Sequence, residues 1–271
     1  MNACRSRRLS FASEWSFPPT VLAVVLILLA AVSSALTADD NDKTLLPAST
    51  PAGQYEALVN EYQKAQQEFS SAYTAAKTDE EREKLSSKYP QPKAYLRRFL
   101  ELAQKHPKDP VAFDALAWVV TNDRYGEKIN ETLEILLRDH VESEKLGPVA
   151  QALVYSSARE PAKILEGIVE KNPHREVKGV ATFTLGLVQK GQAKEPEAEK
   201  LFEQVVEKFG DVQDGFRGTL AAAARGQLYE IQNLGIGKVA PEIQGEDVEG
   251  KSFKLSDYRG KVVVIDFWGD W

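Results

Sequence analysis

The sequence predicts a mainly α-helical protein, built of helical hairpin repeats and followed by the N-terminal part of an α/β domain. Two observations predict the helical part. Apolar residues recur at spacings of three and four over most of residues 54–235, and similar helical segments return at a nearly constant interval. A third observation predicts the change of class, because beyond residue 235 this periodicity ends and apolar residues alternate at period two. We therefore divide the chain into residues 1–38, 39–53, 54–235 and 236–271.

Residues 1–38 have the pattern of a secretory signal peptide. Arg5, Arg7 and Arg8 precede an unbroken apolar run over residues 21–32, and small residues at 33–35 then offer a cleavage site. The apolar run is shorter than the roughly 20 residues that span a bilayer, but an uncleaved membrane anchor stays an open alternative. Either reading predicts an exported protein of the periplasm or cell envelope, with possible N-terminal membrane association. Residues 39–53, rich in Asp, Pro and small residues, are predicted to be a linker.

Composition excludes two classes of function. The formal net charge of −6 argues against a nucleic-acid partner, which requires a basic surface. The single cysteine, Cys4, lies in the predicted leader, so no disulfide can form within the chain and no Cys/His metal site is expected. No cofactor is predicted.

The first helical segment is predicted between residues 54 and 77, where apolar and aromatic residues lie on one face (Leu58, Tyr62, Ala65, Phe69, Ala72 and Tyr73). Thr78 is the expected N-cap of the next helix, with Glu80, Glu81 and Glu83 in its first turn. We interpret these carboxylates as a solvated face that supports the cap, and not as a catalytic pair.

Four similar helical segments then follow. They begin at residues 99, 132, 165 and 202, that is 33, 33 and 37 residues apart, and each ends at Pro, His or Gly. In two cases a second helix with an aromatic core follows, at residues 113–118 and 183–187. A period near 34 built from helix pairs resembles tetratricopeptide-like repeats, although the full consensus is absent. Each hairpin has an apolar face that only its neighbour can cover, so we expect one continuous core.

The three histidines, His106, His140 and His174, are 34 residues apart each time. Equivalent positions on stacked helices lie roughly 8–10 Å apart, whereas the ligands of one metal ion lie about 2 Å from it. We therefore interpret the spacing as repeat register and not as a metal site.

The last 35 residues carry the chemistry. Residues 241–255 are predicted to form an extended or hairpin segment with its turn at Glu249-Gly250, and residues 262–265 (VVVI) a central strand covered on both faces. Asp266 follows at the strand's carboxyl end, where open α/β folds place their sites. A carboxylate there is costly to bury unless it is partnered or functional.

This stretch resembles the start of a thioredoxin-like redoxin domain. The resemblance rests on Gly237-x-x-Ala240-Pro241, on Leu255-Ser-Asp257-Tyr258-x-Gly260-Lys261 and on the final run VVVIDFWGDW, and it points to exported thiol–disulfide oxidoreductases of the TlpA/ResA type, with peroxiredoxins (AhpC/TSA) further off. The resemblance implies that the residue after Trp271 would be the nucleophile of a Cys-x-x-Cys pair. It also implies that Asp266 is the buried acid that exchanges a proton with the resolving cysteine.

Two functions from different classes follow from these expectations. The first is a thiol–disulfide oxidoreductase or antioxidant redoxin, with protein thiols or disulfides as partners. Because the nucleophilic cysteines are absent from this chain, we expect it to be truncated and inactive. We also expect its exposed apolar strand to be prone to association. The second is a noncatalytic interaction module of the cell envelope, in which the helical repeats bind a protein partner. The sequence leaves open the redox partner, the direction of the reaction and the ligand of the repeats.

Overall fold

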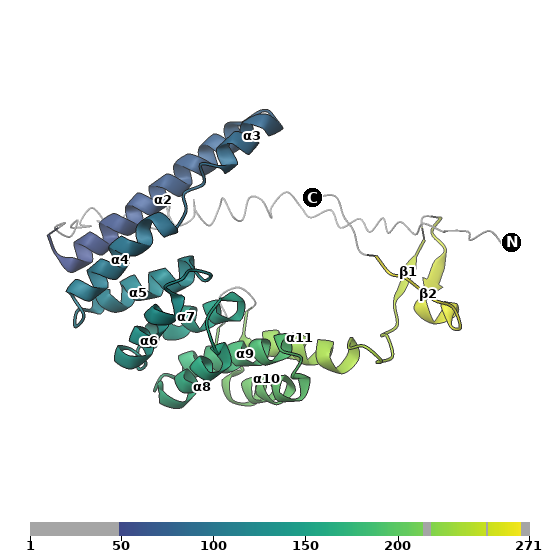
Figure 1. The fold of residues 1–271 in the computed structure, drawn as a ribbon. Helices are drawn as coiled ribbons and strands as arrows, with labels where there is room; N and C mark the ends of the chain where they lie inside the picture. Colours follow the sequence, from purple (N-terminus) through teal and green to yellow (C-terminus); the bar gives the residue numbers. More distant parts are fainter. Residues whose placement is uncertain (1–48, 214–217, 248, 267–271) are drawn as a thin grey trace, which may run out of the picture. The chain divides into compact units, whose positions relative to one another are not determined.

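The computed structural model describes residues 49–213, 218–247 and 249–266 (Figure 1). The predicted leader and most of the predicted linker lie outside these ranges. The chain divides into a helical unit, Leu45–Gln232, and a second unit that includes Asn233–Trp271. The mainly α-helical class is confirmed, and the sheet of the described residues has two short strands.

Helix α2 (Pro51–Ala75) begins three residues earlier than predicted, inside the segment assigned to the linker. The correction has a local cause. Thr50 is the N-cap and its hydroxyl accepts a hydrogen bond from the amide of Gly53 at 3.1 Å, while Pro51 occupies the first turn, where its missing N–H and fixed φ cost nothing. The apolar face predicted for this helix is buried at Leu58 and Tyr62, whereas Ala72 and Tyr73 near its end are exposed.

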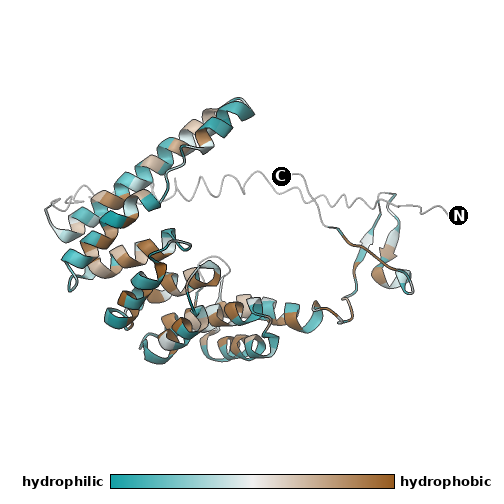
Figure 2. Ribbon diagram, in the orientation of Figure 1, coloured by the Kyte–Doolittle hydropathy of each residue, from teal (hydrophilic) through white to brown (hydrophobic). Residues whose placement is uncertain are grey.

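Helix α3 (Asp79–Ser86) confirms Thr78 as an N-cap. The Thr78 hydroxyl accepts from the amide of Glu81 at 3.2 Å, and the Glu81 carboxylate accepts from the Thr78 amide at 3.4 Å, which completes a capping box. The helix has no buried residue, and in Figure 2 it is drawn mostly in the hydrophilic colour. Glu81 therefore serves the helix end, as the sequence indicated.

The repeat segments are helices whose ends lie where the sequence placed them. The C-caps of the first helix of each copy are His106, His140, Asn172 and Gly210. The bounds of the repeat helices are α4 (Lys93–Lys105), α5 (Pro110–Asn122), α6 (Ile129–Asp139), α7 (Gly147–Ala152), α8 (Pro161–Lys171), α9 (Arg175–Gly191), α10 (Glu195–Phe209) and α11 (Leu220–Asn233), with 3₁₀ turns η1 (Glu144–Leu146) and η2 (Leu153–Tyr155) on either side of α7.

One hydrophobic core runs through the described helical unit. Successive helices pack in pairs, α4 on α5, α5 on α6, α8 on α9 and α9 on α10, and the short helix α7 packs on both α5 and α9. The Trp118 ring of α5 stacks on Phe99 of α4 with ring centroids 4.0 Å apart, and Phe202 of α10 is fully buried. α7 therefore joins the first half of the array to the second.

Among the described residues, no helix is both long enough and apolar enough to cross a membrane.

The second unit contains a β-hairpin, as the sequence predicted. Strand β1 (Gln244–Glu246) pairs antiparallel with β2 (Ser252–Lys254), with Gly245 opposite Phe253. The turn between them contains Gly250 at φ +73°, a conformation that glycine adopts without steric cost. A 3₁₀ turn, η3 (Leu255–Tyr258), follows the hairpin directly.

Candidate functional site

The turn of the hairpin and the turn after it are held by carboxylates. The Asp247 carboxylate accepts hydrogen bonds from the amides of Glu249 at 3.0 Å and Lys251 at 2.9 Å. Downstream, the Glu242 carboxylate accepts from the Ser256 amide at 3.0 Å. Hydrogen bonding from the Ser256 side chain, and then from its backbone, lowers the pKa of Glu242 because it favours the charged form. These contacts fix the path of the chain into the segment that carries Asp266.

Residues 262–265, predicted to be a central strand, are not in a strand and are exposed. The side chain of Val262 is 96% exposed and that of Val264 is 89% exposed. The strand prediction is therefore wrong for this structure. A β-strand is held by hydrogen bonds to a neighbour, and no described strand pairs with this run. The exposure agrees with the expectation of an uncovered apolar segment.

Asp266, the candidate buried acid, lies at the end of this extended run and is exposed. The proton exchange that the resemblance implies for it stays a prediction. The adjoining aromatic residues 267, 268 and 271 lie outside the described residues.

Comparison with known proteins gives short matches of one kind. No family model matches the chain, and no solved structure matches it. The thiol–disulfide oxidoreductase ResA of Bacillus thuringiensis subsp. konkukian is 40% identical over 47 residues, which is 17% of this chain and 27% of that protein. The ResA of Geobacillus thermodenitrificans is 45% identical over 38 residues, 14% of this chain and 22% of that protein. The chain is similar to thiol–disulfide oxidoreductases. The matches span about a quarter of the length of these curated relatives. The identity within them supports a resemblance to the thioredoxin-like family over this short stretch.

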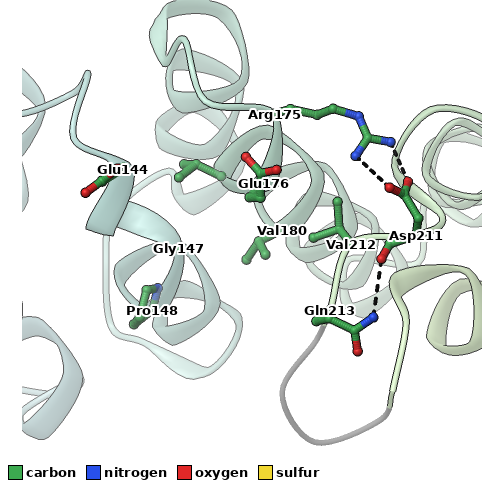
Figure 3. A pocket seen from close by; sticks show the side chains of 10 residues that line it. Glu144, Gly147, Pro148, Arg175, Glu176, Val180, Asp211, Val212 and Gln213 are labelled. Atoms are coloured by element: carbon green, nitrogen blue, oxygen red, sulfur yellow. Dashed lines mark hydrogen bonds and ion pairs between the residues drawn. The ribbon is translucent and has the colours of Figure 1, made fainter.

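A second candidate site is a cavity of about 350 Å³ in the helical unit (Figure 3). Three separate segments line it: residues 144–148 at η1 and the start of α7, the first turns of α9, and residues 211–213 after α10. Val177 and Val212 are buried, while Glu144 and Glu176 are exposed; Figure 3 shows Glu144 near η1 and Glu176 on α9. The sequence analysis missed this cavity, because residues more than 60 positions apart line it and no local motif marks them.

Arg175 and Asp211 form one wall of the cavity. The Arg175 guanidinium makes two bonds to the Asp211 carboxylate, at 2.5 and 3.2 Å, and donates a third to the backbone carbonyl of Lys208 at 2.7 Å. The hydrogen bond from Arg175 lowers the pKa of Asp211, and the same bond raises that of Arg175. Arg175 also lies over the Phe209 ring at 5.8 Å. Its charge is therefore engaged within the helical unit.

The described residues contain no group of three or more His, Cys, Asp or Glu side chains placed to hold a metal ion. His106 and His140 are the C-caps of α4 and α6, and His174 is the N-cap of α9. His140 packs edge-on against Phe113 with ring centroids 5.8 Å apart, and this burial lowers its pKa.

Proposed function

We propose that this chain is an exported protein of the thioredoxin-like family, in which residues 236–271 begin a thiol–disulfide oxidoreductase domain and the helical repeats bind the partner protein. The observation that carries the redox part is the 40–45% identity to thiol–disulfide oxidoreductases over 38–47 residues. That length is close to the 35 residues, 237–271, on which the motif resemblance rests.

The chemistry proposed for the domain is thiol–disulfide exchange. A cysteine thiolate attacks one sulfur of a substrate disulfide and releases the other as a thiolate; the second cysteine then attacks the mixed disulfide, so the protein pair is oxidised as the substrate is reduced. Asp266 would accept the proton of the second cysteine. The 271 residues contain one cysteine, Cys4, so this pair is not among them. The proposed reaction therefore requires a form of the protein that carries such a pair.

Two measurements test the redox proposal. The gene is sequenced past codon 271, where a Cys-x-x-Cys in the same or a shifted frame is expected; a stop codon with no downstream cysteine pair would sink the proposal. The 271-residue chain is then assayed for reduction of insulin disulfides beside a form extended through that pair. Turnover is expected from the extended form alone, and turnover by the 271-residue chain would contradict our account of the site.

A second candidate function is a noncatalytic interaction module formed by the helical repeats. The observation that favours it is that the described helical unit encloses a continuous core of its own and bears a cavity between its helices. In this case the 271-residue chain binds its partner with no redox residue. Partner binding that survives replacement of Cys4 by serine and deletion of residues 236–271 would favour this function, and loss of binding on that deletion would oppose it.

A further inference from the structure

The cavity of the helical unit is lined by apolar and acidic side chains. The buried side chains of Val177, Val180 and Val212 line it together with the exposed residues Glu144 and Glu176, which come from different segments of the chain. Its volume of about 350 Å³ falls at the lower end of the range of pockets that hold small ligands.

The charges at the cavity do not cancel. Asp211 is neutralised by its two bonds to Arg175. The carboxylates of Glu144 and Glu176 have no ion-pair partner among the described residues, so the cavity lining keeps a formal charge of about −2. A lysine nearby, Lys145, is already paired with Asp114 at 3.1 Å and does not compensate them.

We infer that this cavity binds a basic side chain, lysine or arginine, from a partner protein. The aliphatic stem of such a side chain packs along the cavity wall against the valines, and its charged end lies beside Glu144 or Glu176 in contact with water. The inference builds on the proposal that the helical repeats bind a partner, and it specifies the chemistry of that partner. It does not depend on redox activity.

An anionic ligand fits the cavity less well than a cationic one. The one cation that lines it, Arg175, is occupied by Asp211, by the Lys208 carbonyl and by the Phe209 ring. An anion would have to displace Asp211 and would lie beside two further carboxylates. A cation can pair with Glu144 or Glu176 and leaves the bonds between Arg175 and Asp211 in place.

The experiment titrates the 271-residue chain, carrying ¹³C-labelled valine methyl groups, with the peptide acetyl-GSKSG-amide. The methyl signals of Val177, Val180 and Val212 are expected to shift in a saturable way. The peptide acetyl-GSQSG-amide, which lacks the charge, should leave them in place. Equal shifts with both peptides, or no shift with the lysine peptide, would overturn the inference.

Matched variants then test the two parts of the site. The double variant Glu144→Gln/Glu176→Gln is expected to raise the dissociation constant for the lysine peptide about tenfold, the effect of two exposed ion pairs. Glu166→Gln/Glu170→Gln is the control, since it makes the same change in net charge at exposed positions of α8 that do not line the cavity. Equal weakening by both double variants would show long-range attraction only, and would contradict a built site.

The last variant blocks the cavity with no change of charge. A Cβ added at Gly147 meets no heavy atom within 4 Å, so Gly147→Leu is expected to fold and to place its side chain in the cavity. It should abolish the valine shifts. If Gly147→Leu binds the peptide as well as the unchanged chain does, the inference is wrong. That result would not affect the redox proposal, which insulin reduction tests, or the proposal that the repeats bind a partner.

Discussion

Gly186 lies where α9 passes close to α10, and it sets how near the two helices approach. A Cβ built at this position would come within 2.6 Å of the buried Phe202 ring. Gly186→Ala is therefore expected to lower the free energy of unfolding by about 1–3 kcal/mol through overpacking. Urea denaturation followed by circular dichroism measures the change.

Gly167 in α8 is the matched control for this prediction. A Cβ added there meets nothing within 4 Å, so Gly167→Ala should raise the free energy of unfolding by about 0.5–1 kcal/mol, the usual gain for alanine in a helix interior. The two substitutions are thus expected to change the free energy of unfolding in opposite directions. If both stabilise the protein, the close approach of α9 and α10 is not as described.

His140 provides a prediction about pH. Its burial lowers its pKa from the ordinary value of 6.5, although the charge of Asp139 acts in the opposite direction. The unfolded chain then takes up a proton more readily than the folded one. The free energy of unfolding should therefore fall as the pH drops below 6.5, until the pH passes the folded pKa.

The measurement is a proton NMR titration of the His140 ring together with unfolding curves at pH 7 and pH 5. His140→Gln should unfold with a smaller loss of stability between these two pH values than the unchanged chain. A His140 pKa above 6.5 in the folded protein would contradict the prediction.

At the scale of single residues, the sequence was most informative where a residue acts on its own backbone. Thr78 was predicted as a cap because its hydroxyl needs only the amide three residues later, and the structure shows that bond. The burial proposed for Asp266 depends on neighbours far along the chain, and the structure places it in solvent. The cavity could not be predicted for the same reason, since Glu144 and Glu176 come to line one cavity only after the helices pack.

At the scale of elements, Asn172 joins two parts of the array. This fully buried side chain, at the C-cap of α8, donates to the carbonyls of Val141 at 2.7 Å and Ser143 at 2.9 Å, and accepts from the amide of His174. The turn after α8 is thereby tied to the chain after α6.

Asn172→Ala is expected to lower the free energy of unfolding by about 1–3 kcal/mol, because it removes the three hydrogen bonds of a fully buried side chain. Asn60→Ala, at an exposed position of α2, is the control and should change stability by less than about 0.5 kcal/mol. Thermal and urea unfolding of both variants measure the difference. Similar effects of the two substitutions would show that the Asn172 bonds do not tie the turns.

The ends of α4, α8 and α10 could be predicted at this scale because Pro107, Pro173 and Gly210 follow them, and Pro and Gly stop a helix locally. The strand predicted at residues 262–265 is absent because β-branched residues favour a strand but do not form one alone. A strand also needs a neighbouring backbone to pair with, and no described segment provides one. α7 is six residues long, too short to show a helical period, so its role as the link between α5 and α9 emerged only from the packing.

At the scale of the helical unit, the single core predicts a single unfolding transition. Leu165→Ala removes a fully buried side chain from α8 and should cost about 2–5 kcal/mol. Trp118 lies in α5, far along the chain from this change. In a chain whose other three tryptophans are replaced by phenylalanine, the fluorescence transition of Trp118 should move to lower urea together with the circular dichroism transition.

Tyr125→Ala is the control for this substitution, because its side chain is 73% exposed and its loss should leave both transitions in place. Separation of the fluorescence and circular dichroism midpoints in Leu165→Ala would mean that the two halves of the array unfold one after the other.

The cavity has a mechanical consequence. In an array of stacked helices each part contacts only its neighbours, so small rotations between parts add up to bending of the whole. Glu144, Arg175 and Gln213 belong to three successive parts, and they all line one hollow. Any flexing of the array between α7 and α11 must widen or narrow that hollow. A side chain bound in the hollow would therefore stabilise one curvature of the helical array. A force that straightens the array would weaken the binding of that side chain.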